Sequence, residues 1–258
     1  MLKTYEIGDS DGKPVVMVHG LFGQARNLGA LARRLAQDGR RVVSVDMRNH
    51  GDSFWSDDHT YPAMAHDLAE VVDMLGGRAD LVGHSMGGKA SMTLALTQPD
   101  MVRRLVVMDI APVAYAHDQL GMIDAMEAIN LTGIRLRSQA DTLLAEHISD
   151  PGIRAFLLQS LNVKEDPAQW KANLRVLRAR MPELVGWPAE LTGTHFYNPT
   201  MLLTGDDSNY VTEEGRVAMR SHFPLGRIVR VKAAGHWLHA DAPETTAGGI
   251  AAYLAGPG

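Results

Sequence analysis

The segment Gly83-His84-Ser85-Met86-Gly87 fits the pattern G-x-S-x-G, in which a serine stands at the apex of a tight strand-to-helix turn. The backbone at that apex is strained, so the residues two positions away must be small. An apolar run precedes Gly83 and an Ala/Met/Leu-rich run follows Ser85, as the turn requires. We therefore interpret Ser85 as the nucleophile of an acyl-transfer site. The alternative is a glycine-rich turn with an unreactive serine.

A nucleophilic serine needs N–H donors that stabilise the oxyanion of the tetrahedral intermediate. The N–H of Met86 is one candidate, because the N-terminus of a helix attracts negative charge. We expect the second donor in the loop His19-Gly20-Leu21-Phe22-Gly23, which follows the first apolar run. The N–H of Leu21 is the first choice and that of Phe22 the alternative. We expect His19 to hold this loop by hydrogen bonds.

Of the eleven histidines, His236 is the predicted general base. It follows a glycine after the last apolar run, and its position near the C-terminus fits a chain order of serine, acid, histidine. We expect His239 to pack this loop or to face the substrate. The spacing of His236, His239 and Asp241 also permits a metal site, but no further ligand cluster supports one. We predict neither a metal nor another cofactor.

The acid must fix the tautomer of the histidine and stabilise its imidazolium form. Asp109 ends the apolar run after the serine motif, whereas Asp206 and Asp207 lie in a later turn. Hydrolases with this chain order usually carry the acid where Ser208 stands, and serine supplies no charge. We therefore favour Asp109. A helix cap is the alternative role for Asp109, and a solvated turn for Asp206 and Asp207.

Apolar runs typical of buried strands alternate with helical patterns along most of the chain. This alternation predicts a mostly parallel sheet with helices on both faces and a site at the carboxyl ends of the strands. The expected strands are 15–19, 41–46, 79–83, 104–109, 200–204 and 227–231, and the expected helices are about 28–37, 61–75, 86–97 and 243–254.

The alternation stops between Pro112 and about Thr194, where we see no convincing strand and helical patterns at 122–129 and 169–177. We predict an α/β core of residues 1–111 and 195–258 with a helical cap, or lid, of residues 112–194. Apolar cap residues could line an acyl pocket or pack the cap onto the core; they are Met122, Met126, Phe156, Leu157, Leu158 and Trp187.

Composition narrows the class of protein. The formal net charge of -5 offers no basic excess for nucleic acid, and cysteine is absent, which removes disulfides, thiolate zinc sites and a cysteine nucleophile. No run has the length of a membrane helix, and the N-terminus lacks the apolar core of a signal peptide. We expect a cytoplasmic protein that acts on a small molecule, and its oligomeric state stays open.

Taken together, six segments resemble the YbfF-type bacterial esterases and the related mitochondrial abhydrolase, both of the α/β-hydrolase superfamily. They are 19–23 (HGLFG), 46–51 (DMRNHG), 61–64 (YPAM), 83–89 (GHSMGGK), 109–113 (DIAPV) and 235–240 (GHWLHA). The resemblance implies the α/β-hydrolase fold and a cytosolic esterase or thioesterase, with acyl-CoA among the candidate substrates. It also implies an acid on the strand of Asp109 and a serine at position 208.

Two charged residues in these segments have open roles. We interpret residues 46–51 as a strand end and a tight turn that shape the wall of the site, with anion binding by Arg48 as the alternative. Lys89 lies one turn into the helix after Ser85, and we expect it to pair with a nearby carboxylate.

The sequence thus predicts a serine hydrolase that cleaves carboxylic esters or thioesters through a Ser-His-Asp acyl-enzyme mechanism. The alternatives are a C–C bond hydrolase of dienoic ring-fission products, a cofactor-free perhydrolase, and a non-enzymatic receptor for small molecules. Epoxide hydrolase and dehalogenase chemistry would need Asp at the position of Ser85.

Overall fold

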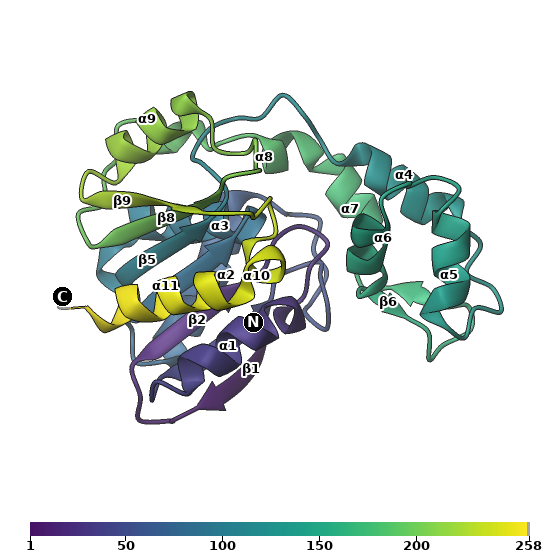
Figure 1. Cartoon of the computed structure of the whole chain (residues 1–258), viewed down its shortest axis with the longest axis horizontal. Helices are drawn as coiled ribbons and strands as arrows, with labels where there is room; N and C mark the ends of the chain where they lie inside the picture. The colour runs from purple at the N-terminus through teal and green to yellow at the C-terminus, as the bar shows by residue number, and fades with distance from the viewer. Residues whose placement is uncertain (257–258) are drawn as a thin grey trace.

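A seven-stranded sheet places strand β4, which ends at His84, near its centre. The computed structural model describes residues 1–256 (Figure 1). The strand order is β1-β3-β2-β4-β5-β8-β9. All neighbours in this sheet are parallel except β1 and β3. The strands are β1 (Lys3–Gly8), β2 (Pro14–Val18), β3 (Arg41–Asp46), β4 (Ala79–His84), β5 (Val102–Met108), β8 (Thr200–Gly205) and β9 (Gly226–Val231).

Helices cover both faces of this sheet, as the alternation predicted. One face packs against α1 (Gly29–Ala36) and α11 (Pro243–Ala255), and the other against α2 (Tyr61–Met74), α3 (Met86–Thr97) and α9 (Glu213–His222). Along β2, Val15 and Met17 pack on the face covered by α1 and α11, and Val16 packs on the face covered by α2, α3 and α9. Because successive side chains point to opposite faces, a strand that is buried on both sides reads as one continuous apolar run.

Two elements of this core were not predicted from the sequence. Strand β1 is an edge strand with mostly exposed side chains, so it carries little apolar signal; its pairing with β3 holds it in place. Helix α9 begins after Thr212, whose side chain accepts the N–H of Gly215. Few of its side chains are buried, and its apolar stripe is therefore weak.

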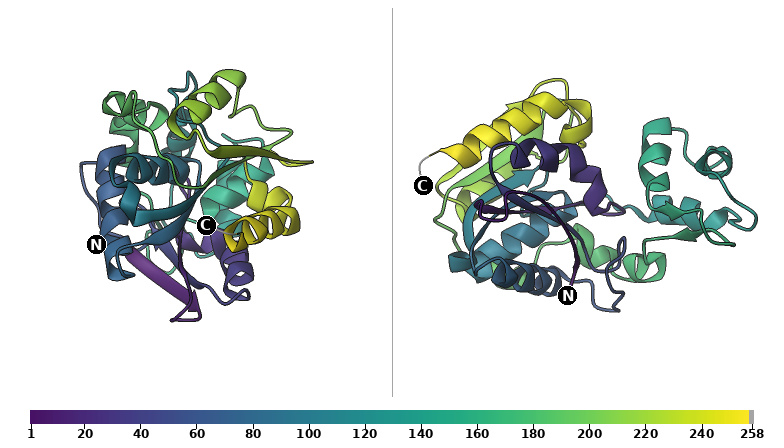
Figure 2. Two further views of the ribbon diagram at one scale, coloured as in Figure 1. Left: turned by 90° about the vertical axis from the view of Figure 1, so that its left-hand side faces the viewer. Right: turned by 90° about the horizontal axis from the view of Figure 1, so that it is seen from below.

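The chain between β5 and β8 forms a group of short helices that projects from the core in Figures 1 and 2. The first three helices share an apolar cluster, and the first and third of them also bury Ile123, Met126 and Leu157 in the main core. The helices are α4 (Leu120–Ala128), α5 (Arg137–Leu144), α6 (Pro151–Leu158), α7 (Leu174–Ala179) and α8 (Met181–Val185). The remaining short elements are α10 (Leu238–Asp241) and the 3-10 turns η1 (Ala25–Leu28), η2 (Pro99–Met101) and η3 (Ala189–Leu191).

The prediction of no strand between 112 and 194, and of a helix over 169–177, was wrong in part. Strand β6 (Leu161–Asn162) pairs antiparallel with β7 (Gln169–Trp170), and helix α7 begins only at Leu174. The indole N–H of Trp170 donates to the carbonyl of Met126 in α4 (2.9 Å). Tertiary contacts of this kind override a helical pattern in so short a segment.

The second half of the inserted segment is hydrogen-bonded to the core. The N–H of Gly51 donates to the carbonyl of Lys171 (2.7 Å), and the hydroxyl of Tyr61 donates to the carbonyl of Leu184 (2.7 Å). Asn173 donates to Asn49 from both its backbone and its side chain. The segment from Lys171 to Leu184 is therefore fixed to the loop after β3 and to α2.

Lys89 joins helix α3 to both ends of the inserted segment. Its ammonium group is buried and donates to the carbonyls of Val113 (2.8 Å), Val185 (3.1 Å) and Gly186 (2.5 Å). The prediction that Lys89 pairs with a carboxylate is therefore wrong, because its ammonium group donates to backbone carbonyls instead. Burial lowers the pKa of Lys89 to about 7.

Among residues 1–256, no helix combines the length and the apolar content that a bilayer span requires.

Candidate active site

Ser85 occupies the sharp turn between β4 and α3 with φ of 53° and ψ of -121°. A positive φ at a non-glycine residue costs roughly 1–3 kcal/mol and persists only where surrounding contacts enforce it. Here the N–H of Ser85 donates to the carbonyl of Met108 on β5 (3.0 Å), and its carbonyl accepts the N–H of Lys89 (3.1 Å). The turn is thus fastened to the neighbouring strand and to the following helix.

The glycines of the motif are needed for close packing. A Cβ on Gly83 would lie 2.4 Å from the carbonyl oxygen of Gly87. A Cβ on Gly87 would lie 2.5 Å from the carbonyl oxygens of both Val18 and His19. The turn therefore packs directly on the loop after β2, which brings that loop next to Ser85.

His236 follows β9 and bonds to a carboxylate at the end of β5. Its Nδ1–H donates to Oδ2 of Asp109 (2.8 Å). Asp109 is fully buried, and its other oxygen accepts the hydroxyl of Thr204 and the N–H of Gly205 (both 3.1 Å). The hydroxyl of Ser208 donates to Oδ2 as well. Four donors offset the cost of removing this carboxylate from water.

The other two acid candidates lie at the surface and do not bond to the histidine. Asp206 and Asp207 are exposed, and a carboxylate oxygen of Asp206 lies 3.7 Å from the guanidinium of Arg230. Their backbone N–H groups donate to the carbonyls of Val231 and Ala234, which closes the turn after β8. Of the alternatives that the sequence left open, the structure brings only Asp109 into contact with His236.

Two buried histidines hold the loop 19–23. His19 Nδ1–H donates to the carbonyl of Gly20 (2.7 Å), and its Nε2 accepts the N–H of Met47 (3.0 Å). In His50, Nδ1–H donates to the carbonyl of Arg48 (2.9 Å), so Nε2 is free to accept the N–H of Phe22 (3.1 Å). Burial lowers the pKa of His19 to about 4 and that of His50 to about 3. Both rings are therefore neutral near pH 7.

These hydrogen bonds distinguish between the two candidate oxyanion donors in the loop, the N–H groups of Leu21 and Phe22. Because the N–H of Phe22 is bound to His50, it is not available to a ligand. Leu21 lines the same cavity as Ser85 and Met86. Met86 is the first residue of α3, where backbone N–H groups have no partner within the helix.

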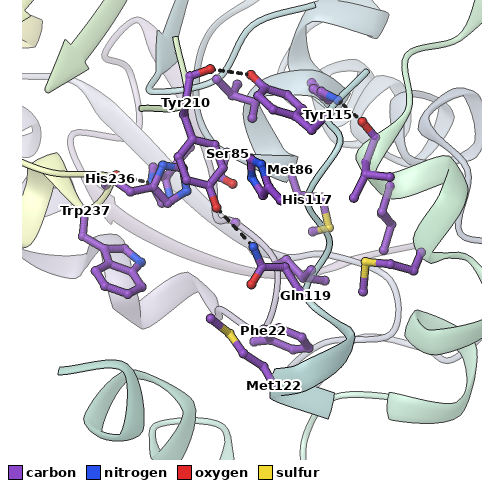
Figure 3. A pocket seen from close by; sticks show the side chains of 18 of the residues that line it. Phe22, Ser85, Met86, Tyr115, His117, Gln119, Met122, Tyr210, His236 and Trp237 are labelled. Atoms are coloured by element: carbon purple, nitrogen blue, oxygen red, sulfur yellow. Dashed lines mark hydrogen bonds between the residues drawn. The ribbon is translucent and has the colours of Figure 1, made fainter. Parts of the chain in front are cut away.

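A cavity of about 240 Å³ opens in front of Ser85 and His236 (Figure 3). Met122 and Phe156, two of the cap residues considered from the sequence, line it. Met126, Leu157 and Leu158 are instead buried in apolar clusters, and Trp187 packs against the core. The apolar wall also includes residues that the sequence did not indicate: Ile153, Met181, Leu184, Val185 and Trp237.

Arg48 is not part of this cavity. Its guanidinium donates twice to the carboxylate of Asp67 (2.6 and 2.8 Å) and once to the carbonyl of Asp58 (2.9 Å). These contacts support the structural interpretation of residues 46–51 over anion binding by Arg48.

A model of the alpha/beta hydrolase family matches residues 15–248. The chain belongs to this family. Esterase YbfF of Escherichia coli is 38% identical over 248 residues, which are 95% of this chain and 94% of that protein. The sn-1-specific diacylglycerol lipase ABHD11 of Mus musculus is 39% identical over 256 residues, which are 96% of this chain and 83% of that one. The solved structure of a marine microorganism esterase superposes with a TM-score of 0.91 at 31% identity, covering 98% and 99% of the two chains.

Two side chains of this alpha/beta hydrolase family member contact His236 and were missed from the sequence. His84 Nε2–H donates to the carbonyl of His236 (2.9 Å), and the ring of Tyr210 stacks on the imidazole with centroids 3.7 Å apart. The serine motif itself contains His84, so its position was a usable signal. Tyr210 lies in an irregular loop after β8, and only the tertiary structure reveals its contact.

The packing of the turn predicts that Gly87→Ala destabilises the protein severely. The added methyl group overlaps two backbone carbonyls that cannot move without displacing β2, so we expect a loss of about 3 kcal/mol or more. Urea unfolding followed by circular dichroism measures this loss. Gly121→Ala is the control, because nothing lies within 4 Å of a Cβ there. Equal stability of the two variants would contradict the packing argument.

The neutral histidines predict that acid destabilises the protein. His50 has a pKa of about 3 when folded and about 6.5 when unfolded, so its contribution to stability is complete above pH 6.5 and is lost as the pH falls. The unfolding free energy of His50→Gln should fall less steeply between pH 6 and 4, by about 1.4 kcal/mol per pH unit.

Urea denaturation at several pH values measures this slope. His66→Gln serves as the control for exchanging a histidine on the surface, where its side chain is 73% exposed. A His50→Gln slope identical to that of the unmodified protein would show that His50 does not carry the acid sensitivity.

Proposed function

We propose that this protein hydrolyses carboxylic esters through an acyl-enzyme formed on Ser85, with His236 as general base and Asp109 as the acid that orients it. The proposal rests on one observation. The strained turn of Ser85 and the buried Asp109–His236 pair meet at one apolar cavity, although they come from β4, β5 and the loop after β9.

In the first step, His236 Nε2 takes the proton of the Ser85 hydroxyl while the serine oxygen attacks the acyl carbonyl. The resulting imidazolium is stabilised by Asp109 through Nδ1–H. The tetrahedral intermediate then expels the alcohol or thiol, which receives the proton from His236. Water attacks the acyl-enzyme in the same manner, and the carboxylic acid leaves with Ser85 restored.

The N–H groups of Leu21 and Met86 would donate to the oxyanion. Two features support this pair: the N–H of Phe22 is bound to His50, and Met86 lies at the N-terminus of α3. Each such donor typically contributes roughly 100- to 1,000-fold to the rate. The loop packs on Gly87, so the two donors keep a fixed separation.

The cavity lining favours an apolar acyl group. Its side chains are mainly aliphatic and aromatic, and among residues 1–256 neither a carboxylate nor a guanidinium lines it. Its ammonium group, on Lys89, is bound to three carbonyls. Relatives named as an esterase and as a diacylglycerol lipase agree with ester cleavage. We propose oxygen esters and thioesters as substrates, handled in the cytoplasm without a cofactor.

The same lining argues against one alternative, the C–C bond hydrolase. Dienoic ring-fission products carry carboxylates, and among residues 1–256 no arginine lines the cavity and its one lysine is bound to carbonyls, which disfavours C–C bond hydrolysis. We further propose that residues 112–194 act as a cap. Met122 and Phe156 reach from the cap into the cavity, while its 171–184 portion is fixed to the core.

We predict that Ser85→Ala lowers the turnover of p-nitrophenyl esters by about 10⁴- to 10⁶-fold and leaves the fold intact, because the nucleophile alone is removed. Initial rates with esters of increasing chain length measure the loss. Circular dichroism confirms the fold. A variant with near-normal turnover would rule out the mechanism.

A fluorophosphonate distinguishes an enzyme from a receptor, because it forms a covalent adduct with an activated serine. We expect an adduct on Ser85, mapped by mass spectrometry. We expect none on Ser91, which is buried in α3 and donates to the carbonyl of Gly87. A protein that binds esters without adduct or turnover would be a receptor.

The assignment of Asp109 as the acid predicts the order of kcat among three variants. Asp109→Asn should lower kcat by about 10³- to 10⁴-fold, since an amide holds the wrong tautomer of His236. Asp206→Asn and Asp207→Asn should retain kcat within about threefold, because surface substitutions of exposed groups are usually mild. The reverse order in steady-state assays would move the acid to the loop after β8.

A further inference from the structure

Tyr210 covers one face of the proposed general base. Its ring lies over the imidazole of His236 with centroids 3.7 Å apart and an angle of 16° between the planes. The bond from His236 to Asp109 lies at the edge of the imidazole, so it fixes Nδ1 but leaves the ring free to tilt about that bond. A parallel ring restricts this tilt.

Tyr210 is itself held at four points. Its N–H donates to the hydroxyl of Ser208 (3.2 Å), and its carbonyl accepts the hydroxyl of Tyr115 (3.0 Å). The side-chain amide of Gln119 donates to its phenol oxygen (3.2 Å), as Figure 3 shows. The edge of His117 meets its ring at a centroid distance of 5.0 Å. Three of these partners belong to the start of the inserted segment, before α4.

We propose that Tyr210 is a positioning residue for His236, whose stacked ring fixes the plane of the imidazole and stabilises the imidazolium that forms when Ser85 loses its proton. This inference rests on the proposed function. An aromatic face attracts a cation through its quadrupole, and the attraction is larger when the pair is shielded from water. The stack therefore favours the charged transition state over the neutral ground state.

Four titratable groups surround His236. Asp109 bonds its Nδ1, the ring of His84 lies at a centroid distance of 4.8 Å, His239 neighbours it on α10, and Tyr210 covers its face. Burial lowers the pKa of both His84 and His239, so neither adds a positive charge near pH 7. Burial raises the pKa of Tyr210, so its ring stays a neutral phenol in this range.

The test compares Tyr210→Phe, which keeps the aromatic face, with Tyr210→Leu, which removes it. The assay is hydrolysis of p-nitrophenyl butyrate from pH 5 to 9. We expect Tyr210→Leu to lower kcat about 5- to 30-fold, the range of a cation–π contact. The acid limb of kcat/KM should move to lower pH by about 0.7 to 1.5 units, because the imidazolium of the free enzyme loses the same contact.

Tyr210→Phe should keep kcat within about threefold and leave the acid limb in place, since the hydroxyl contributes only the neutral bond from Gln119, of about 1 kcal/mol. Tyr197→Leu, at a tyrosine that is 64% exposed, is the matched control. A proton-NMR titration of the His236 ring gives its pKa directly. A merely structural role would lower activity without moving that pKa.

The inference is overturned if Tyr210→Leu keeps the rate and the acid limb, or if Phe and Leu lose activity equally. Should Tyr210→Leu fail to fold by circular dichroism, Tyr210→Met carries the same comparison. Ser85→Ala in the same assays distinguishes a failure of this inference from a failure of the proposed function. An inactive Ser85→Ala beside an unaffected Tyr210→Leu refutes the stack alone, whereas an active Ser85→Ala refutes the proposed function.

Discussion

The close contact between the turn at Ser85 and the loop after β2 is the constraint on which the site depends. Ser85 adopts a positive φ because its N–H is bound to β5 and its carbonyl to α3, while Gly83 and Gly87 leave no room for a side chain. The same contact places Leu21 and Ser85 at one cavity. The proposed nucleophile and the proposed oxyanion donors therefore lie on segments that pack directly on each other. Two buried neutral histidines, His19 and His50, hold the loop after β2 by hydrogen bonds.

The buried carboxylate of Asp109 joins three neighbouring parts of the fold. It follows β5 directly, accepts hydrogen bonds from β8 and from the turn after it, and binds the histidine that follows β9. Because Ser208 donates to the same oxygen as His236, the turn that carries no acid of its own still contributes to holding it. Four donors thus compensate for the removal of this charge from water.

The inserted segment is not uniform in its attachment. Lys89 bonds both of its ends to α3, and residues 171–184 bond to the core. Helices α4 to α6 share an apolar cluster, and α4 and α6 also bury Ile123, Met126 and Leu157 in the main core. Met122 and Phe156 reach the cavity from α4 and α6.

The sequence by itself determined the sheet, the alternating helices and the identity of Ser85, His236 and Asp109 as candidates, because these depend on short-range periodicity and on a turn whose glycines are sterically required. Edge strand β1 and the β6–β7 hairpin left too little apolar pattern to predict. Only the tertiary structure decided which acid reaches the histidine, that Lys89 binds carbonyls and that Tyr210 stacks on His236. Each of these contacts joins residues far apart in the chain, and local sequence carries no information about the distance between them.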